Sequence, residues 1–157
     1  MRIENDIKLD YSGVLLRPKR STLGSRKEVD LKRKYKFLYS DHTYTGVPII
    51  AANMDGVGTW EMNNVLAEHG MLTCITKHYN IATCVEQLQK ANGYNAVYSM
   101  GITSDDIAKF RAVNAGAKLK YVCIDVANGY SERFLNFVGD FRQEFPDKVI
   151  IAGNVVT

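Results

Sequence analysis

Five apolar segments of strand length recur along the chain at nearly constant spacing, and this repeat restricts the fold more than any other feature. They begin at residues 47, 71, 96, 121 and 149, so successive starts are 24, 25, 25 and 28 residues apart. Each segment is almost continuously apolar and rich in Val and Ile, which is typical of strands buried on both faces of a parallel sheet. The predicted strands are Val47–Ala52, Met71–Ile75, Ala96–Met100, Tyr121–Val126 and Val149–Val156.

Four segments with the apolar period of a helix lie between these strands. The residues predicted to cap them are Thr59, Thr83 in a capping-box pattern with Glu86, Thr103 or Ser104, and Ser131. The expected helix ends are Gly70, Asn92-Gly93, Gly116 and Phe145. In the first helix, we expect Met62, Val65 and Leu66 to share the inward face.

Strands that alternate with helices at this period predict the α/β class with a parallel sheet. The candidate architectures are a (β/α)8 barrel and an open doubly wound sheet, and the absence of a GxGxxG motif after the first strand disfavours the open sheet. A barrel usually needs about 250 residues. The 157 residues therefore predict the N-terminal portion of a TIM barrel, with about five strands and four helices. We expect residues 1–46 to form a basic arm and residues 47–157 the strands, whose open edges another segment or partner must cover.

Composition and charge exclude several classes of protein. With 46% hydrophobic and 24% charged residues, the chain resembles a soluble globular domain, and its longest apolar run is far shorter than the ~20 residues of a membrane helix. The first residues lack the pattern of a secretory signal, so a cytoplasmic location is expected. The three cysteines, Cys74, Cys84 and Cys123, show neither a disulfide framework nor metal-ligand spacing. We expect the cysteines to be inert, because Cys74 and Cys123 fall inside apolar strands; only Cys84, in the first turn of a predicted helix, has a setting that could lower a thiol pKa.

Basic residues are concentrated near the N-terminus, where nine of the 20 Lys and Arg residues lie between Arg17 and Lys36. Three interpretations remain open: a solvated face, a surface for an anionic small molecule or partner subunit, and a nucleic-acid patch. Only Tyr35 and Phe37 lie beside these charges, which are few aromatic side chains for stacking the bases of a single-stranded nucleic acid.

Polar residues recur where the predicted strands end. Because the carboxyl ends of barrel strands meet at one mouth, where the active sites of this fold lie, we expect these side chains to converge. They are Asn53, Asp55, Lys77, His78, Ser99, Thr103, Asp125, Asn128 and Asn154.

Asp125 is the most informative of these residues because it ends a strongly apolar strand, where an unpaired carboxylate is costly. Lys77 ends another strand at the same level and is the expected cationic partner. Such a pair is either a structural strut or a device that orients a substrate group and moves protons. His78 is either an acid or base or merely hydrogen-bonded.

Several motifs resemble the GMP reductase family, in order from Ile3 to Thr157. They are Leu15–Leu23, Gly46–Asp55, Lys77–Tyr79, Asp125–Glu132 and Ala152–Thr157. The sister family, IMP dehydrogenase, differs in carrying serines after the position of Asp125 and a paired regulatory insert. Gly56 and Ile102 stand where the reductases usually have Thr.

The resemblance implies a (β/α)8 barrel that converts GMP to IMP and ammonia with NADPH through a covalent purine–enzyme thioimidate, usually as a homotetramer. It assigns Ser25 and Arg26 to the cofactor of a neighbouring subunit, and Lys77, Asp125, Val126 and Ala127 to the nicotinamide side. It also links Lys77 and Asp125 to the deamination step.

The resemblance also places the family's nucleophilic cysteine and its K+ site beyond Thr157, and none of the three cysteines matches that nucleophile. We therefore expect the chain to be inactive without the C-terminal half of the barrel. The alternatives are a non-catalytic fragment that acts as an assembly or regulatory module, and a related barrel oxidoreductase with another purine nucleotide. Neither a nucleic acid nor a membrane is an expected partner.

Overall fold

The computed structural model describes residues 3, 5, 7, 9–90 and 93–156, which divide into two units, residues 1–30 and 31–157. The described residues of the first unit form two 3-10 turns, Tyr11–Gly13 and Arg26–Glu28, and neither has a buried residue. The Ser25 hydroxyl caps the second turn by accepting a hydrogen bond from the Lys27 backbone N–H at 3.2 Å.

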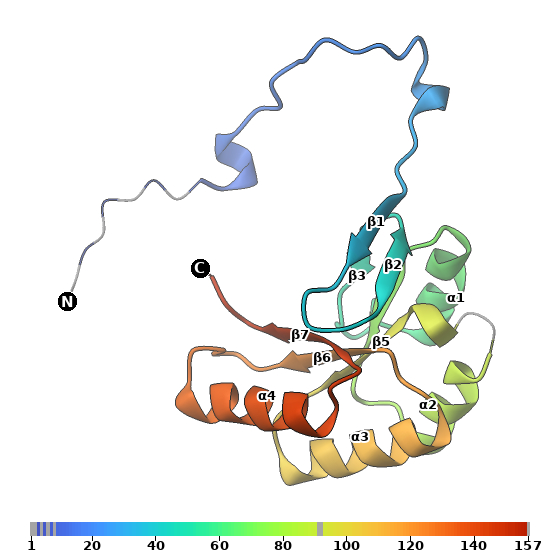
Figure 1. Cartoon of the computed structure of the whole chain (residues 1–157), viewed down its shortest axis with the longest axis vertical. Coiled ribbons are helices and arrows are strands. Elements are labelled where there is room, and N and C mark those ends of the chain that lie inside the picture. The colour runs from blue at the N-terminus through green and yellow to red at the C-terminus, as the bar shows by residue number, and fades with distance from the viewer. Residues whose placement is uncertain (1–2, 4, 6, 8, 91–92, 157) are drawn as a thin grey trace. The chain divides into compact units, whose positions relative to one another are not determined.

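Among the described residues of the second unit, five parallel strands form one sheet, and their order in the sheet equals their order in the chain (Figure 1). They are β3 (Ile50–Ala51), β4 (Leu72–Ile75), β5 (Ala96–Met100), β6 (Tyr121–Asp125) and β7 (Val149–Gly153). The predicted α/β class and all five strands are confirmed. β3 is shorter than predicted because Pro48 lacks a backbone donor, while the Val47 N–H bonds to the Gly70 carbonyl instead of to a strand.

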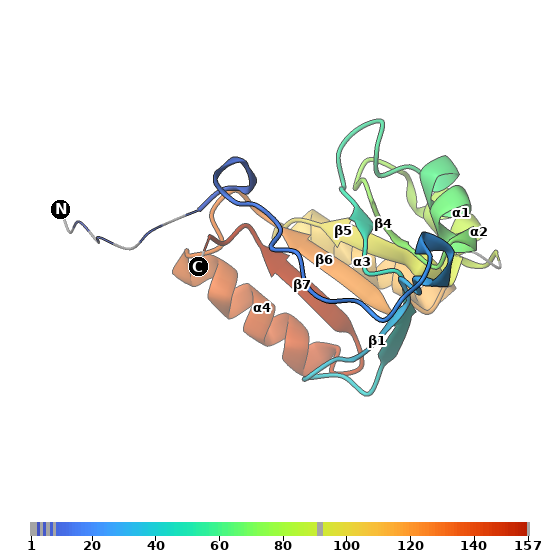
Figure 2. The same cartoon turned by 90° about the horizontal axis from the view of Figure 1, so that it is seen from above.

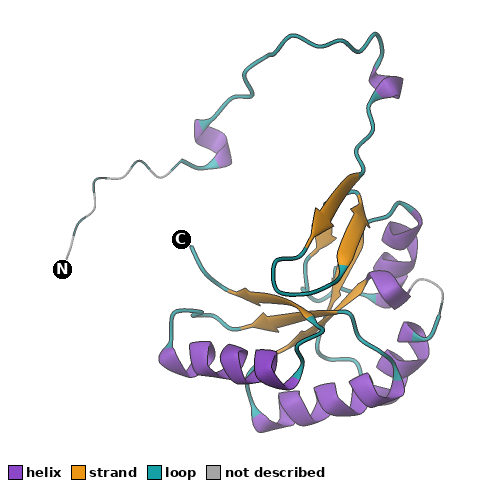
Figure 3. Cartoon of the chain, in the orientation of Figure 1, coloured by secondary structure: helices purple, strands orange, loops and turns teal. Residues whose placement is uncertain are grey.

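In the described part of this unit, four helices alternate with these strands (Figures 1 and 3): α1 (Trp60–Glu68), α2 (Ile81–Leu88), α3 (Ser104–Gly116) and α4 (Glu132–Glu144). Thr59, Thr103 and Ser131 cap α1, α3 and α4 as predicted. The prediction for α2 is wrong. The Asn80 side chain accepts from the Thr83 N–H at 2.8 Å, so the cap lies three residues before the predicted one. The predicted end was Asn92-Gly93, whereas α2 ends at Leu88; Asn92 lies outside the described residues, and Gly93 begins a 3-10 turn, Gly93–Asn95.

The main hydrophobic core lies between the helices and one face of the sheet (Figure 2). At its centre the Phe110 ring packs 4.9 Å, between ring centroids, from both Phe141 and Phe145. The predicted inward face of α1 is wrong, because Trp60, Asn63 and Ala67 are the buried residues and Val65 is exposed. This face has the spacing i, i+3, i+7, but one of its three residues, Asn63, is polar, so the apolar pattern of the sequence did not indicate it.

A hairpin that the sequence did not predict packs on the opposite face of the sheet. Its strands, β1 (Arg33–Lys36) and β2 (Thr43–Gly46), pair antiparallel. Tyr44 is buried, and its hydroxyl contacts the carbonyl oxygens of Val47 and Gly70. Phe37, just after β1, meets Tyr121 edge to face, with 6.0 Å between ring centroids. Through these contacts the hairpin covers this face of the sheet at the amino ends of its strands.

The sheet has two open edges, because among the described strands β3 pairs only with β4 and β7 only with β6. Ile50 and Ile151 on these outer strands are 46% and 37% exposed. The arrangement agrees with the expected portion of a barrel. No helix in the described part of the chain has the length and apolar character needed to cross a membrane.

The first residues of α3 carry a capping box that makes stability depend on pH. The Thr103 hydroxyl donates to Asp106 Oδ2 at 2.7 Å, and the same carboxylate accepts from the Thr103 N–H at 3.1 Å. Partial burial acts to raise the pKa of Asp106, but hydrogen bonds from Thr103 and Gly101 and the charge of Lys77 outweigh it. The pKa of Asp106 in the folded chain is therefore below its usual 3.8.

Replacing Asp106 by Asn is expected to lower the free energy of unfolding at neutral pH by about 1 kcal/mol, the usual value of a helix cap. Because the pKa is lowered on folding, this stabilisation is complete above the unfolded value of 3.8 and is lost as the pH falls through the folded value. Urea unfolding of both proteins over a series of decreasing pH measures the difference. Asp105→Asn is the matched control for charge in the first turn. A difference that persisted in acid would contradict the assignment.

Candidate functional site

The carboxyl ends of the strands surround a cavity of about 130 Å³. Parallel pairing sets Ser99 opposite Cys123 and Asp125 opposite Gly153, so the polar residues end their strands at similar levels. The lining residues are Asn53, Thr76, Lys77, His78, Ser99, Met100 and Asp125. Five of them, Asn53, Lys77, His78, Ser99 and Asp125, belong to the nine predicted rim residues. The structure therefore brings these five together at one mouth.

Asp125 is held by an amide. Asn53 Nδ2 lies 2.8 Å from Asp125 Oδ2 and 3.1 Å from Ser99 Oγ, so the two protons of one amide group serve two acceptors. Ser99 is buried, and Asn53 and Asp125 are half-buried. The hydrogen bond satisfies the carboxylate without neutralising its charge.

The expected ion pair between Lys77 and Asp125 is not formed in the described part of the chain. Lys77 is exposed, and its carbonyl oxygen accepts a hydrogen bond from Lys109 Nζ. A solvated ammonium group gains little from a surface ion pair, and Asn53 already supplies the hydrogen bond that the carboxylate needs. Lys77 nevertheless lines the same cavity as Asp125.

Asp55 and His78 form a second, outer group at the mouth. Asp55 Oδ1 accepts from the Thr76 hydroxyl at 3.2 Å and lies 3.7 Å from His78 Nε2. The two side chains of this His–Asp pair are 67% and 82% exposed, which makes the interaction weak. The sequence did not indicate Thr76, because a Thr at the end of an apolar strand carries no distinctive signal.

The remaining predicted rim residues organise the loops instead of lining the cavity. Thr103 caps α3, and Asn128 Oδ1 accepts from the Tyr130 N–H at 2.9 Å. Backbone bonds of 2.8 Å join Val126 N–H to the Gly153 carbonyl and Asn154 N–H to the Val126 carbonyl. The loops after β6 and β7 are thereby tied together beside Asp125.

The residues expected to contact a cofactor are divided between the two units. Ser25 and Arg26 belong to residues 1–30, where Ser25 caps the turn that contains Arg26. Val126 and Ala127 follow β6 directly, and Ala127 is exposed. Among the residues that the structure describes, no cluster of three or more His, Cys, Asp or Glu side chains could hold a metal ion.

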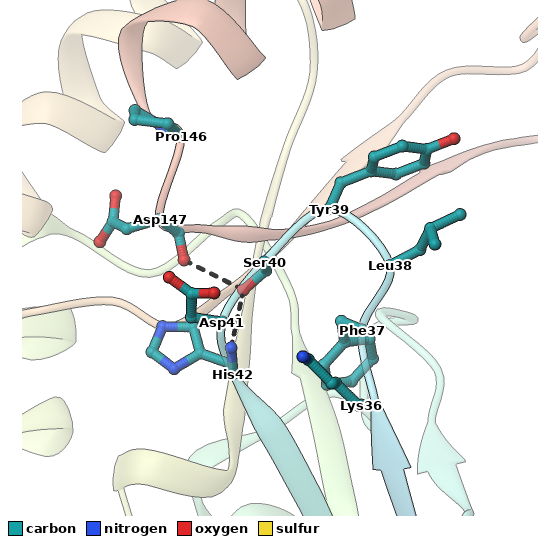
Figure 4. Close-up of a pocket in the computed structure, with 9 residues that line it drawn as sticks. All are labelled: Lys36, Phe37, Leu38, Tyr39, Ser40, Asp41, His42, Pro146 and Asp147. Atoms are coloured by element: carbon teal, nitrogen blue, oxygen red, sulfur yellow. Dashed lines mark hydrogen bonds between the residues drawn. The ribbon is translucent and has the colours of Figure 1, made fainter.

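A larger cavity, of about 490 Å³, lies at the other end of the strands, between the β1–β2 loop and the segment that leads into β7 (Figure 4). There Ser40 Oγ donates to the Asp147 carbonyl at 3.4 Å and accepts from the His42 N–H at 3.2 Å. This end of a barrel serves stability, whereas reactions take place at the carboxyl ends of the strands. We therefore assign the site to the smaller cavity.

The cysteines have distinct environments. Burial raises the pKa of Cys84, against any lowering by its position near the start of α2, which agrees with the expectation that the cysteines are inert. A hydrogen bond with Cys123 and burial raise the pKa of Cys74. The same hydrogen bond, received from the Cys74 thiol, lowers the pKa of Cys123 against the opposing effects of burial and Asp125.

Comparisons with known proteins agree on one family. Residues 8–157 match the model of the IMP dehydrogenase / GMP reductase domain. The chain is 51% identical over 162 residues to GMP reductase 2 of Homo sapiens and of Bos taurus, covering 99% of this chain and 45% of each relative. It is 48% identical over 161 residues to GMP reductase of Vibrio parahaemolyticus, covering 100% of this chain and 46% of that protein.

A crystal structure of inosine 5′-monophosphate dehydrogenase from Legionella pneumophila has the same fold. It superposes with a TM-score of 0.75 at 24% identity, over 93% of this chain and 44% of that one. The chain thus spans less than half the length of the relatives that it matches.

The thiol environments predict an order of reactivity. In the folded protein, N-ethylmaleimide is expected to modify Cys123 at least about tenfold faster than Cys74 or Cys84, because Cys123 is the more exposed and only its pKa is lowered. Mass spectrometry of tryptic peptides over time measures the three rates, and protein unfolded in urea is the control. Equal rates in the folded protein would contradict the environments described above.

Proposed function

The chain belongs to the IMP dehydrogenase/GMP reductase family, and on that premise we propose that it is the N-terminal part of an enzyme that converts GMP to IMP and ammonia with NADPH. The observation that supports the reductase assignment is the identity of 48–51% over nearly the whole chain with proteins named GMP reductase. In this proposal a C-terminal half completes the barrel and brings the family's nucleophilic cysteine and K+ site.

The reaction defines what the residues at the mouth must do. It replaces the amino group on the purine ring by hydrogen: GMP + NADPH + H+ → IMP + NADP+ + NH3. NADPH, when bound, supplies the hydride, and the protein must deliver a proton to the departing amine.

Lys77 and Asp125 are the proposed catalytic residues. The Lys77 ammonium carries three protons, and the Asp125 carboxylate accepts hydrogen bonds only. Both line the cavity at the strand ends. In this proposal Lys77 donates a proton to the departing amine, while Asp125 orients the amine and stabilises the positive charge that develops on it.

The residues present fit one end of the cofactor. The cavity of about 130 Å³ is smaller than the ~300–1,000 Å³ of a site that encloses a whole ligand, so it suits a single ring and not a dinucleotide. We assign Lys77, Asp125, Val126 and Ala127 to the nicotinamide end. Ser25 and Arg26 are proposed to bind the cofactor from a neighbouring subunit of a homotetramer, which also gives the basic segment an anionic ligand.

Completing the barrel tests this function. The chain is joined to the remainder of human GMP reductase 2, which supplies the length that the match does not cover. We expect GMP-dependent oxidation of NADPH by this completed barrel and none by the chain alone. Reduction of NAD+ with IMP, without GMP reduction, would indicate a dehydrogenase. Binding of the chain to intact reductase subunits without activity would favour an assembly or regulatory module, and turnover of another purine nucleotide a related oxidoreductase.

In the completed barrel, Asp125→Asn is expected to lower kcat at least about 100-fold, the usual contribution of a group that handles protons, with a much smaller change in KM for GMP. The amide keeps the shape of the side chain but loses its charge. Steady-state kinetics measures both parameters, with Asp140→Asn on the exposed surface of α4 as the matched control. Equal losses in kcat and in affinity, or no loss, would contradict a catalytic role.

A further inference from the structure

Three strand ends meet in one hydrogen-bonded group at the mouth: Asn53 follows β3, Ser99 lies in β5 and Asp125 ends β6. The Asn53 amide joins the other two, at 3.1 Å to Ser99 Oγ and 2.8 Å to Asp125 Oδ2. Ser99 is only 3% exposed, so it is a fixed anchor for the amide. The geometry requires the nitrogen of Asn53 to face Asp125, because its oxygen would oppose a carboxylate.

The loop that carries Asn53 is itself held closely. Backbone N–H groups of Val57 and Gly58 bond to the Met54 carbonyl at 3.0 and 2.8 Å, and the Thr76 N–H bonds to the Gly58 carbonyl at 2.8 Å. A side chain at Gly58 would collide with the carbonyl oxygen of Cys74 and crowd the backbone of Asn53. The amide therefore projects from a turn packed against β4, which limits its freedom to move.

The chemical character of Asn53 determines what it leaves available. A cationic partner would neutralise Asp125, whereas a neutral amide fixes the carboxylate and preserves its charge. The other charged or titratable side chains that line the cavity are Lys77 and His78, and neither is within ion-pair distance of Asp125 in the described chain. The carboxylate of Asp125 thus faces the cavity with a neutral partner, Asn53, and no cationic partner among the described residues.

We infer that Asn53 is the positioning residue of Asp125: anchored by Ser99, its amide holds the carboxylate in the orientation used in deamination and leaves Lys77 free to donate its proton. This role rests on the proposed function. Side chains other than Asn fail for identifiable reasons. Gln is longer by one carbon, Ala makes no hydrogen bond, and Asp places a second negative charge against Asp125.

The test uses the completed barrel defined above. Asn53→Ala is expected to lower kcat about 10- to 100-fold, the loss expected for a hydrogen bond to a charged group, with KM for GMP and NADPH changed less than about threefold. Asn136→Ala, on the exposed surface of α4, is the matched control. In an Asp125→Asn background, Asn53→Ala is expected to have no further effect on kcat, because the residue acts through Asp125.

Asn53→Asp provides a readout that a purely structural role would not change. Its kcat relative to wild type is expected to recover as the pH falls, once the two carboxyl groups share a proton and the hydrogen bond is restored. A second measurement needs no activity: urea unfolding midpoints of Asn53→Ala, Asp125→Asn and the double variant of the chain should be non-additive.

The outcomes are distinguishable. Normal kcat in Asn53→Ala, multiplicative losses in the double variant, or additive unfolding midpoints would overturn the inference and leave the proposed function intact. A completed barrel that fails to reduce GMP before any substitution would instead refute the proposed function, and the catalytic part of the inference with it.

Discussion

The parallel hydrogen-bond ladder from β4 to β7 is the constraint on which the rest of the structure depends. It fixes the level of each strand relative to its neighbours, with Ser99 opposite Cys123 and Asp125 opposite Gly153. A shift of one residue in this register would turn every side chain to the other face of the sheet. The hydrogen bonds from Asn53 to Ser99 and Asp125 exist only because the ladder brings those two strand ends to the right height.

The amino ends of the strands contribute to stability, and the carboxyl ends form the candidate site. At the amino ends, Tyr44 and Phe37 of the hairpin segment close the structure with buried apolar surface and with contacts to main-chain carbonyls. At the carboxyl ends, polar groups surround a small cavity. Because these stabilising contacts lie at the opposite end, the fold does not depend on the residues at the mouth, which can vary with the chemistry of the site.

The parts of this structure that the sequence predicts are those determined locally. Buried parallel strands require continuous apolar runs, and Thr59, Thr103 and Ser131 cap helices through contacts within a few residues. The sequence did not predict the β1–β2 hairpin, because all four residues of β1 are exposed and the strand therefore lacks the alternation of apolar and polar residues. Asn53 and Asp125 were both recognised as rim residues, but their contact spans 72 positions of the chain and depends on how the sheet curves. A favourable charge pairing suggested Lys77 instead.

The identity of strand order and chain order has a consequence for how the molecule forms. Each strand from β4 onward pairs with the strand that precedes it in the chain, separated by a single helix. During synthesis, each new strand can therefore pair at once, because the strand that it pairs with has already been made. Assembly in the order of synthesis follows from this topology, with each strand from β4 to β7 added to the edge formed by the strand before it.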